Sequence, residues 1–212
     1  LFRACADLGR QPHEILVVSG IGCSSNLPGF FRSYGVHSLH GRALPVATGA
    51  KLANHDMTVV VTGGDGDGYG IGLNHFIQAM RRNIDITYIV MDNETYGLTT
   101  GQISPTSETG MVTKTTPHGN LEGMLNPMAL ALASGCGYVA RGFSGQPKHL
   151  LKLYTEAIQH PGFALIDVFR LGVYARLPHV VERREERLKE AVAFYLRRDF
   201  RAARKLLDGL LD

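Results

Sequence analysis

The sequence predicts an α/β fold, with an open, mostly parallel sheet, helices on both of its faces, and a charged helical tail at the C-terminal end. Apolar runs rich in β-branched residues alternate with segments of helical periodicity, which is typical of successive βαβ units. Glycine and polar residues follow these runs, as expected where parallel strands end near a ligand. With 212 residues, 44% of them hydrophobic, the chain is long enough for one buried core with a small appendage.

The order of apolar and helical patterns gives the expected elements. We expect strands at residues 15–19, 36–39, 58–62, 87–91, 138–141 and 164–168. We expect helices at residues 43–53, 73–82, 127–134 and 147–158. Asn126-Pro127 begins the third of these helices, because the amide can cap it and proline suits its first turn. Residues 97–126 form a connection of a length that is uncommon unless it is functional.

The charge is divided unevenly between two expected regions, a domain at residues 1–175 and a tail at residues 176–212. The tail holds ten Lys/Arg and seven Asp/Glu, and the domain holds twelve of each, so the net charge of +3 lies in the tail. A neutral domain argues against nucleic-acid binding. The tail has the pattern of one or two amphipathic helices that pack on the domain or on a partner subunit.

No window approaches eighteen uninterrupted apolar residues, so no membrane span is expected. The three cysteines do not provide a disulfide framework, and a reducing cytoplasm is the simplest setting.

The most informative motif is Gly63-Gly-Asp65-Gly-Asp67-Gly-Tyr-Gly70, which lies between an expected strand and an expected helix. Glycines allow a ligand close to the backbone and leave N–H groups free for anionic oxygens. Two carboxylates beside a phosphate would repel it unless a cation lies between them. The motif therefore favours a diphosphate bridged by Mg²⁺.

Other glycine-rich motifs fit this stretch less well. A P-loop needs Lys followed by Ser or Thr after its glycines, and neither follows here. The dinucleotide fingerprint needs glycines at i, i+2 and i+5, which no frame from Gly63 to Gly72 supplies. An EF-hand needs further oxygen ligands through a twelve-residue loop, and Ile71, Leu73 and the following helix do not provide them. A plain glycine-rich turn with exposed aspartates remains possible for the Gly-Asp-Gly part alone.

Asn93 lies twenty-eight residues after Asp65, and the interval holds one expected helix and one expected strand. A right-handed crossover would bring both strand ends side by side. Asp65 and Asn93 could then bind one Mg²⁺, together with the backbone carbonyl of Thr95. This spacing resembles the thiamine-diphosphate motif, in which Gly-Asp-Gly precedes Asn-Asn. In this chain the second pair is Asp92-Asn93, which retains the metal-binding amide.

Several further motifs agree in order and spacing with one family. They are Gly20-Ile-Gly-Cys23-Ser-Ser25, Leu39-His40-Gly-Arg42, Asn93-Glu-Thr-Tyr96-Gly-Leu-Thr-Thr-Gly-Gln102, Ser104-Pro-Thr106 and Lys114-Thr-Thr-Pro117. From about Glu14 to Asp167 the chain resembles the β subunit of a 2-oxoacid:ferredoxin oxidoreductase. The resemblance implies a thiamine-diphosphate-binding fold and oxidative decarboxylation of a 2-oxoacid to an acyl-CoA, with electrons passed to ferredoxin.

The resemblance also implies roles for individual residues. Mg²⁺ would be bound by Asp65, Asn93 and the carbonyl of Thr95. His40 would be the catalytic side chain, either donating to an oxyanion or moving a proton, and the alternative is a hydrogen-bonded turn histidine. Arg42 and Thr100 are candidates for the substrate carboxylate. The expected cofactor contacts are Ile21, Gly22, Cys23, Ser24, His40, Gly64, Asp65, Gly66, Asp67, Asn93, Tyr96, Gly97 and Leu98.

The family also holds a [4Fe–4S] cluster with four cysteines in this subunit, and only Cys23 matches one of them. One thiolate cannot hold such a cluster, so this chain is not expected to bind one alone. Two explanations remain open: an incomplete or rearranged copy of a working subunit, or a relative that has lost the cluster. Cys5 is expected on a helix surface or in a packing position, and Cys136 as a small core residue.

The resemblance implies an obligate heteromer, because an α subunit would supply the carboxylate beside the aminopyrimidine ring of the cofactor. Coenzyme A, a 2-oxoacid and ferredoxin are the other implied partners. The alternative function is a non-catalytic cofactor-binding or scaffold subunit without a cluster. A non-oxidative thiamine decarboxylase is a third reading, which the Gly-Ile-Gly-Cys-Ser and Ser-Pro-Thr segments disfavour.

Overall fold

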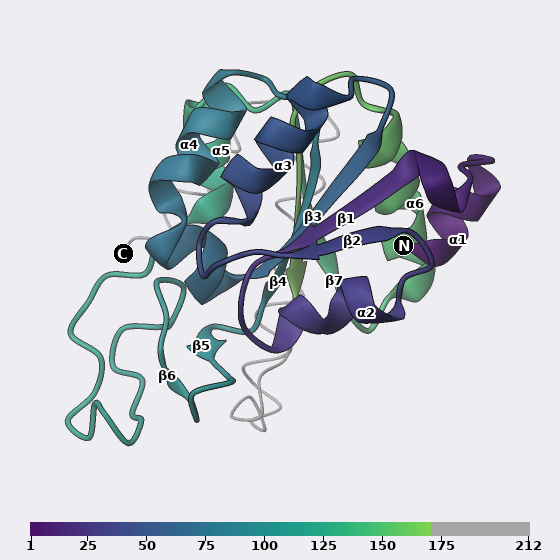
Figure 1. Ribbon diagram of the computed structural model, residues 1–212. Coiled ribbons are helices and arrows are strands. Elements are labelled where there is room, and N and C mark those ends of the chain that lie inside the picture. Colours follow the sequence, from purple (N-terminus) through teal and green to yellow (C-terminus); the bar gives the residue numbers. More distant parts are fainter. Residues whose placement is uncertain (171–212) are drawn as a thin grey trace. The chain divides into compact units, whose positions relative to one another are not determined.

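The computed structural model describes residues 1–170 of the 212-residue chain. These residues form a compact unit from Leu1 to Arg170, with a parallel sheet at its centre (Figure 1). The expected helical tail and the expected domain boundary after residue 175 lie outside the described residues. Within the described part, no helix combines the length and the apolar character that a membrane span needs.

The central sheet has six strands in the order β2-β1-β3-β4-β8-β7, and every neighbouring pair is parallel. The expected open parallel sheet is confirmed. The strands are β1 (Ile15–Ser19), β2 (Tyr34–His37), β3 (Thr58–Gly64), β4 (Thr87–Asp92), β7 (Tyr138–Phe143) and β8 (Ala164–Phe169). All six carboxyl ends lie at one edge of the sheet, where a small antiparallel hairpin of β5 (Thr95–Tyr96) and β6 (Gln102–Ile103) follows β4.

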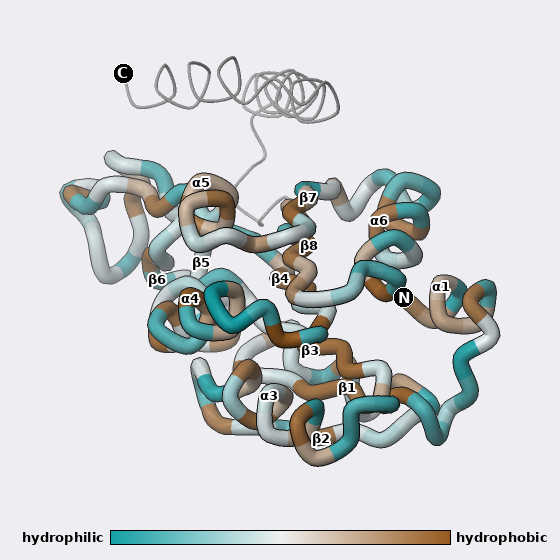
Figure 2. The backbone as a smooth tube through the Cα atoms, turned by 90° about the horizontal axis from the view of Figure 1, so that it is seen from above, coloured by the Kyte–Doolittle hydropathy of each residue, from teal (hydrophilic) through white to brown (hydrophobic). Residues whose placement is uncertain are grey.

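Helices cover both faces of the sheet, as Figure 2 shows from above. One face packs against α3 (Ala43–Ala53), α4 (Leu73–Arg81) and α5 (Pro127–Ala133). The other face packs against α1 (Phe2–Asp7), α2 (Leu27–Phe30) and α6 (Pro147–Gln159). The central strands β1, β3 and β8 are buried over most of their length, which explains their continuous apolar runs.

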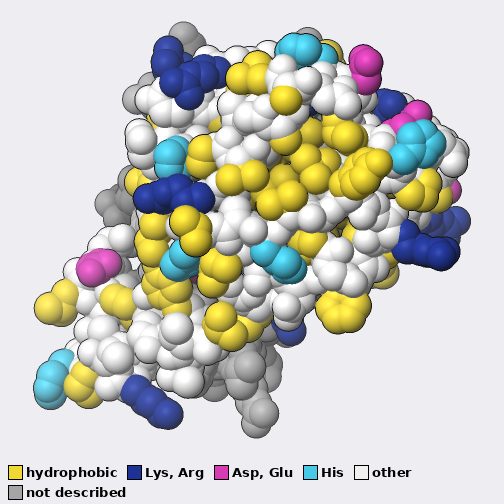
Figure 3. All heavy atoms as spheres, in the orientation of Figure 1, with side chains coloured by type: hydrophobic (Ala, Val, Ile, Leu, Met, Phe, Trp, Pro, Cys, Tyr) yellow, Lys and Arg dark blue, Asp and Glu magenta, His cyan; other side chains and the backbone are white. Residues whose placement is uncertain are grey.

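The edge strand β2 differs from the others, because all four of its residues are exposed. Apolar side chains gather on the surface that carries β2 and α3 (Figure 3), and they include Tyr34, Val36, Leu39, Val46 and Leu52.

Short helical turns lie next to several strand ends, in segments that the sequence predicted as loops. They are η1 (Pro12–Glu14), η2 (Cys23–Asn26) and the π-helix η3 (Gly66–Ile71). The π-helix begins in the middle of the Gly-Asp-Gly-Asp motif, so Gly66 and Asp67 lie in a helical turn rather than an open loop. The backbone N–H of Gly72 donates to the carbonyl of Asp67, 2.9 Å away. Helix α4 therefore starts at Leu73, directly after this turn.

Candidate functional site

A pocket of about 150 Å³ lies at the carboxyl ends of β1, β3 and β4. The chain leaves β1 toward β2 on one side of the sheet, and β3 lies on the other side of β1. Open parallel sheets bind ligands at such a switch point. The lining residues are Ile21, Gly22, Cys23, Ser24, His40, Gly64, Asp65, Gly66, Asp67, Met91, Asn93, Thr95, Tyr96, Gly97, Leu98, Thr99 and Arg170.

All the residues that the sequence predicted to contact the cofactor line this pocket. They come from the turns after β1, β3 and β4 and from the loop before α3. Their roles stay predictions, but the fold brings them to one place. The pocket is smaller than the roughly 300–1,000 Å³ of sites that enclose a drug-sized ligand. The described residues therefore supply part of a site rather than a closed one.

Three oxygen atoms from two strand ends converge on one side of the pocket. The side-chain oxygen of Asn93 lies 3.1 Å from Oδ1 of Asp65 and 2.8 Å from the backbone oxygen of Thr95. Without a cation this orientation brings acceptors together, and rotation of the amide by half a turn would let its nitrogen donate to both oxygens. Mg²⁺ holds oxygens at about 2.0–2.1 Å in an octahedron, so neighbouring ligand oxygens lie about 2.9 Å apart. The two observed distances match that spacing.

No three His, Cys, Asp or Glu side chains within residues 1–170 form a metal-binding group. A divalent ion at this point would therefore depend on one carboxylate, one amide and one carbonyl. Such a set of hard oxygen ligands suits Mg²⁺ when phosphate oxygens or waters complete the coordination.

Asp65 is almost completely buried, with 1% of its surface exposed. Burial raises the pKa of Asp65, while hydrogen bonds from Ser104 and Thr106 oppose that shift. The hydroxyl of Thr106 lies 3.0 Å from Oδ2 of Asp65. A buried carboxylate whose pKa is raised by burial gains from a bound cation.

A second buried acid, Asp92, shares a hydrogen-bonding neighbour with Asp65. The hydroxyl of Thr106 is 2.9 Å from Oδ1 of Asp92, so one hydroxyl contacts both carboxyl groups. Burial raises the pKa of Asp92 well above its usual range, and the charges of Asp167 and Asp65 add to the shift. Asp167 is itself fully buried, and it accepts hydrogen bonds from Tyr69 at 2.9 Å and from Arg141 at 3.2 Å.

The turns around the pocket leave backbone and hydroxyl groups available to an anion. The hydroxyl of Ser24 is buried and has no hydrogen-bond partner within the described chain. A Cβ on Gly64 would lie 3.6 Å from that hydroxyl, and a Cβ on Gly97 would lie 3.4 Å from Sγ of Cys23. An orphaned donor between glycine-lined turns fits a diphosphate group.

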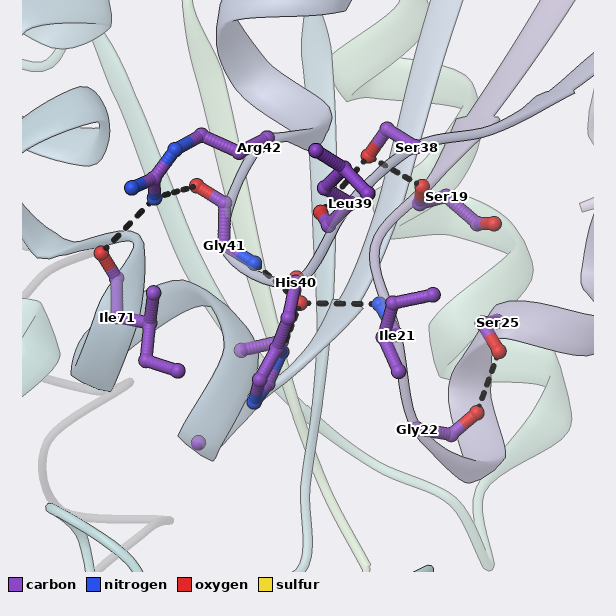
Figure 4. A network of polar contacts seen from close by, with 12 residues as sticks. Ser19, Ile21, Gly22, Ser25, Ser38, Leu39, His40, Gly41, Arg42 and Ile71 are labelled. Atoms are coloured by element: carbon purple, nitrogen blue, oxygen red, sulfur yellow. Dashed lines mark hydrogen bonds and ion pairs between the residues drawn. The ribbon is translucent and has the colours of Figure 1, made fainter.

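Asp67 is a buried residue whose carboxylate joins separate loops. Its Oδ1 accepts hydrogen bonds from the backbone N–H groups of Ile21 at 3.0 Å and Gly41 at 2.7 Å. The Nδ1 atom of His40 lies 2.7 Å from the same oxygen. Figure 4 labels Ile21, His40 and Gly41, the three residues that meet this oxygen. Although Asp67 lines the pocket, its Oδ1 is engaged by the protein, so its side chain orients the loops around the site.

The two candidates for the substrate carboxylate lie outside the pocket lining. The guanidinium of Arg42 is 3.3 Å from the backbone oxygen of Gly41 and 3.4 Å from that of Ile71, as Figure 4 shows. Thr100 has a positive φ of 82°, and its neighbour Thr99 lines the pocket instead. No described contact supports a substrate role for either residue.

The three cysteines lie apart. Cys23 is exposed and lines the pocket, whereas Cys5 and Cys136 are buried in different apolar clusters. Burial raises the pKa of the Cys136 thiol to about 11, as expected for a packing residue. The expectation that this chain does not bind a four-cysteine cluster alone stays a prediction.

The structure adds residues that sequence reasoning did not assign to the site. Arg170 follows β8, and its backbone N–H donates to the carbonyl of Asp92 at 2.7 Å. It is the one lysine or arginine of residues 1–170 that lines the pocket. Its position directly after the last expected strand was the available clue. Thr106 lies in the Ser104-Pro-Thr106 motif, but the sequence spacing did not indicate its contact with Asp65, which spans 41 residues.

Comparison with known proteins identifies relatives of this chain. A family model described as thiamine pyrophosphate enzyme, C-terminal TPP binding domain, matches residues 20–168. A 2-oxoacid:ferredoxin oxidoreductase subunit beta of Saccharolobus solfataricus is 51% identical over 170 residues, which is 79% of this chain and 56% of the relative. A 2-oxoglutarate oxidoreductase subunit KorB of Mycobacterium tuberculosis is 46% identical over 164 residues, 77% of this chain and 44% of the relative. The chain thus spans about half the length of these curated relatives.

Solved structures show the same relationship. The 2-oxoglutarate:ferredoxin oxidoreductase from Magnetococcus marinus, which was solved with 2-oxoglutarate, coenzyme A and succinyl-CoA bound, has a TM-score of 0.78 and 48% identity. The match covers 79% of this chain and 57% of that one. A thiamine diphosphate-dependent 4-hydroxybenzoylformate decarboxylase from Rhodococcus jostii RHA1 has a TM-score of 0.53 and 22% identity, over 80% of this chain and 32% of that one. The second likeness shows the fold alone.

Proposed function

The chain belongs to the thiamine pyrophosphate enzymes and, within them, to the β-subunit family of the 2-oxoacid:ferredoxin oxidoreductases, and we propose that it binds Mg²⁺-thiamine diphosphate through its pocket. Asp65, Asn93 and the carbonyl of Thr95 would hold the metal. The observation that carries this proposal is the convergence of the Asn93 side-chain amide on the Asp65 carboxylate and the Thr95 carbonyl, with spacings of 3.1 and 2.8 Å.

The remaining pocket groups suit the diphosphate and the reacting end of the cofactor. The hydroxyl of Ser24 and the turns at Gly64 and Gly66 would bind phosphate oxygens. His40 would lie near the reacting groups, and Tyr96, Gly97 and Leu98 would cover the ring beside them. When bound, thiamine diphosphate supplies the nucleophilic carbon that makes decarboxylation of a 2-oxoacid possible.

The full reaction that we propose is oxidative decarboxylation of a 2-oxoacid to an acyl-CoA, with electrons passed to ferredoxin. The names of the relatives support this reaction class. A partner α subunit would supply the other half of the site, in agreement with a pocket too small to enclose a cofactor.

A second candidate function is a cofactor-binding subunit that no longer passes electrons. The separation of Cys5, Cys23 and Cys136, two of them buried, favours it over a chain with its own cluster. The two candidates share the same metal and diphosphate site, so they differ only in the electron-transfer step.

Replacing Asp65 tests the shared site. Asp65→Asn keeps the shape of the side chain but removes the ligand charge, and we expect at least a tenfold loss of affinity for Mg²⁺-thiamine diphosphate by calorimetry. Asp56→Asn, at an exposed carboxylate on another turn, is the matched control. Equal affinity in both variants would remove Asp65 from the metal site.

Reconstitution separates the two candidates. The full chain is assembled with an α subunit of a relative, and reduction of a viologen dye is followed with a 2-oxoacid and coenzyme A. Dye reduction that depends on both substrates supports the oxidoreductase. Tight cofactor binding without dye reduction supports the second candidate.

A further inference from the structure

We propose that Asp67 is a positioning residue, which holds the neutral imidazole of His40 with its proton on Nδ1 and presents Nε2 to the pocket as an acceptor. The identity of the ligand that meets Nε2 rests on the proposed function. The arrangement of the two side chains does not, because it follows from contacts within the chain.

The first step is the environment of a single oxygen atom. Oδ1 of Asp67 accepts two backbone N–H groups, from Ile21 and Gly41, and lies 2.7 Å from Nδ1 of His40. Backbone N–H groups can only donate, so this oxygen acts as an acceptor. The residue is buried, with 3% of its surface exposed, which limits competition from water.

The second step is the location of the imidazole proton. A neutral imidazole carries one N–H, and the nitrogen that meets an acceptor must carry it. Nδ1 of His40 therefore donates to Asp67, and Nε2 keeps its lone pair. The two roles expected for His40 are donation to an oxyanion and transfer of a proton. In this neutral form, Nε2 can accept a proton or a hydrogen bond. While Nδ1 keeps its proton, only the doubly protonated imidazolium can donate from Nε2.

The third step is the direction of the ring. His40 lines the pocket, and its side chain is 33% exposed. Figure 4 shows the ring extending away from the backbone of Ile21 and Gly41. It lies nearly perpendicular to the ring of Tyr96, with ring centroids 6.2 Å apart and planes at 81°. Two neighbours thus restrain the ring, and no hydrogen bond within residues 1–170 engages Nε2.

The same oxygen also fixes the loop that carries His40. Gly41 has a positive φ of 68°, and a Cβ there would lie 2.7 Å from the backbone nitrogen of Gly72. Asp67 thus connects the turn after β1, the loop before α3 and the π-helix. This arrangement sets both the place and the tautomer of one side chain, as the aspartate of a Ser-His-Asp triad does for its histidine.

Nuclear magnetic resonance of the full chain labelled with ¹⁵N-histidine reads the tautomer directly. His40→Gln identifies the resonances of His40 among the nine histidines of the chain. At a pH where His40 is neutral we expect the pattern of a protonated Nδ1 and an unprotonated Nε2. The opposite pattern in the unmodified chain overturns the proposal.

Asp67→Asn is the matched perturbation. The amide can keep an oxygen at the position of Oδ1 for Ile21, Gly41 and His40, but it removes the negative charge that favours a proton on Nδ1. We expect the proportion of His40 with its proton on Nε2 to rise in this variant. An unchanged tautomer would show that Asp67 does not control it.

A double-mutant cycle measures the consequence in the assembled enzyme. We expect Asp67→Asn to lower kcat/KM about tenfold or more through the wrong tautomer, but less than about twofold in the His40→Gln background. A similar loss in both backgrounds would mean that Asp67 acts only through loop structure, which overturns the proposal. If the assembled protein shows no activity, the proposed oxidative decarboxylation fails, while the tautomer measurement still decides this inference.

Discussion

Thr106 has one hydroxyl hydrogen, yet its oxygen lies within hydrogen-bond distance of Asp65 and Asp92. The hydroxyl can donate to only one of them, and a proton on one of the two acids would satisfy the other contact. Asp92 is the better carrier, because burial and the charges of Asp167 and Asp65 raise its pKa well above the usual range. A protonated Asp92 would behave like the neutral asparagine found at this place in the common Asn-Asn form of the motif.

Asp92→Asn therefore gives a prediction with a definite pH dependence. The pKa of Asp92 is higher in the folded chain than in the unfolded chain, so the unfolded state loses this proton first as pH rises. Asp92 therefore lowers the free energy of unfolding at pH values above its ordinary pKa of about 3.9, and it has no such effect at lower pH. The amide removes that penalty, and we expect a gain of about 1 kcal/mol at pH 7, or a rise of about 2–4 °C in Tm.

Thermal melts at pH 7 and near pH 4 check this prediction. The difference in Tm between variant and parent should be larger at pH 7. Asp56→Asn, at an exposed turn, should show little difference at either pH. A variant less stable than its parent at pH 7 would contradict a protonated Asp92.

Arg170 is the second case at this scale. Within residues 1–170 it is the one lysine or arginine that lines the pocket, and the lining also contains the acids Asp65 and Asp67. We expect Arg170→Gln to weaken binding of Mg²⁺-thiamine diphosphate about tenfold, because a charge-assisted hydrogen bond contributes about 1.5–3 kcal/mol. Calorimetry checks this, with Arg82→Gln at the end of α4 as control. Equal affinity of the two variants would exclude Arg170 from the binding site.

At the scale of elements, close contacts around the π-helix fix its glycines. A Cβ on Gly68 would lie 2.0 Å from the hydroxyl of Tyr88, which is fully buried in the core. A Cβ on Gly49, in the middle of α3, would meet nothing within 4 Å. The two glycines therefore differ in kind, although both lie in helical segments.

Alanine at each glycine should act in opposite directions. We expect Gly68→Ala to destabilise the chain by roughly 1–3 kcal/mol through overpacking. Gly49→Ala should stabilise it by roughly 0.5–1 kcal/mol, because alanine has the higher helix propensity. Denaturant titrations measure both changes. A Gly68→Ala variant as stable as its parent would show that the close approach of Tyr88 is not required.

Sequence patterns predicted the elements well where burial determines them. The limits of β1 and α3 agree with expectation, and those of β3, β4, β7 and β8 extend only one or two residues further. The edge strand is the exception: the apolar run suggested residues 36–39, whereas pairing with β1 places β2 at Tyr34–His37. On an exposed edge, backbone pairing rather than hydropathy sets the register.

The π-helix was not predicted, because its glycines indicate a turn when they are read locally. Its form depends on groups from other segments, including the hydroxyl of Tyr96, which donates to the carbonyl of Gly66 at 3.2 Å. The long connection at residues 97–126 was predicted, and β6 is the strand that it contains.

At the scale of the whole molecule, the site consists of turns that only the sheet brings together. The spacing of Asp65 and Asn93 sufficed to predict their proximity, because one crossover separates them. Thr106 and Arg170 could not be assigned in this way. Thr106 reaches Asp65 through an irregular loop, and Arg170 approaches Asp92 through the pairing of β4 with β8.

Metal dependence is the prediction that belongs to this scale. We expect Mg²⁺ and thiamine diphosphate together to raise Tm, with about 2.7 kcal/mol of stabilisation when the ligand is at 100 times its Kd. Removal of the metal with EDTA should abolish the rise. Ca²⁺ should give a smaller rise, because its bonds of about 2.3–2.6 Å suit wider oxygen spacings than those at Asn93. A rise that persists in EDTA would contradict a metal-bridged diphosphate.

The hydrogen bond from the N–H of Gly72 to the carbonyl of Asp67 encloses one residue more than the corresponding hydrogen bond of an α-helix. That surplus residue lets Asp67 meet His40 while Tyr69 stays in the core beside Asp167. Deleting it would rotate one part of the turn against the other by about 100°. Homologous chains should therefore vary in length elsewhere, for example at the exposed stretch around Leu121, and keep a constant count between Gly66 and Ile71.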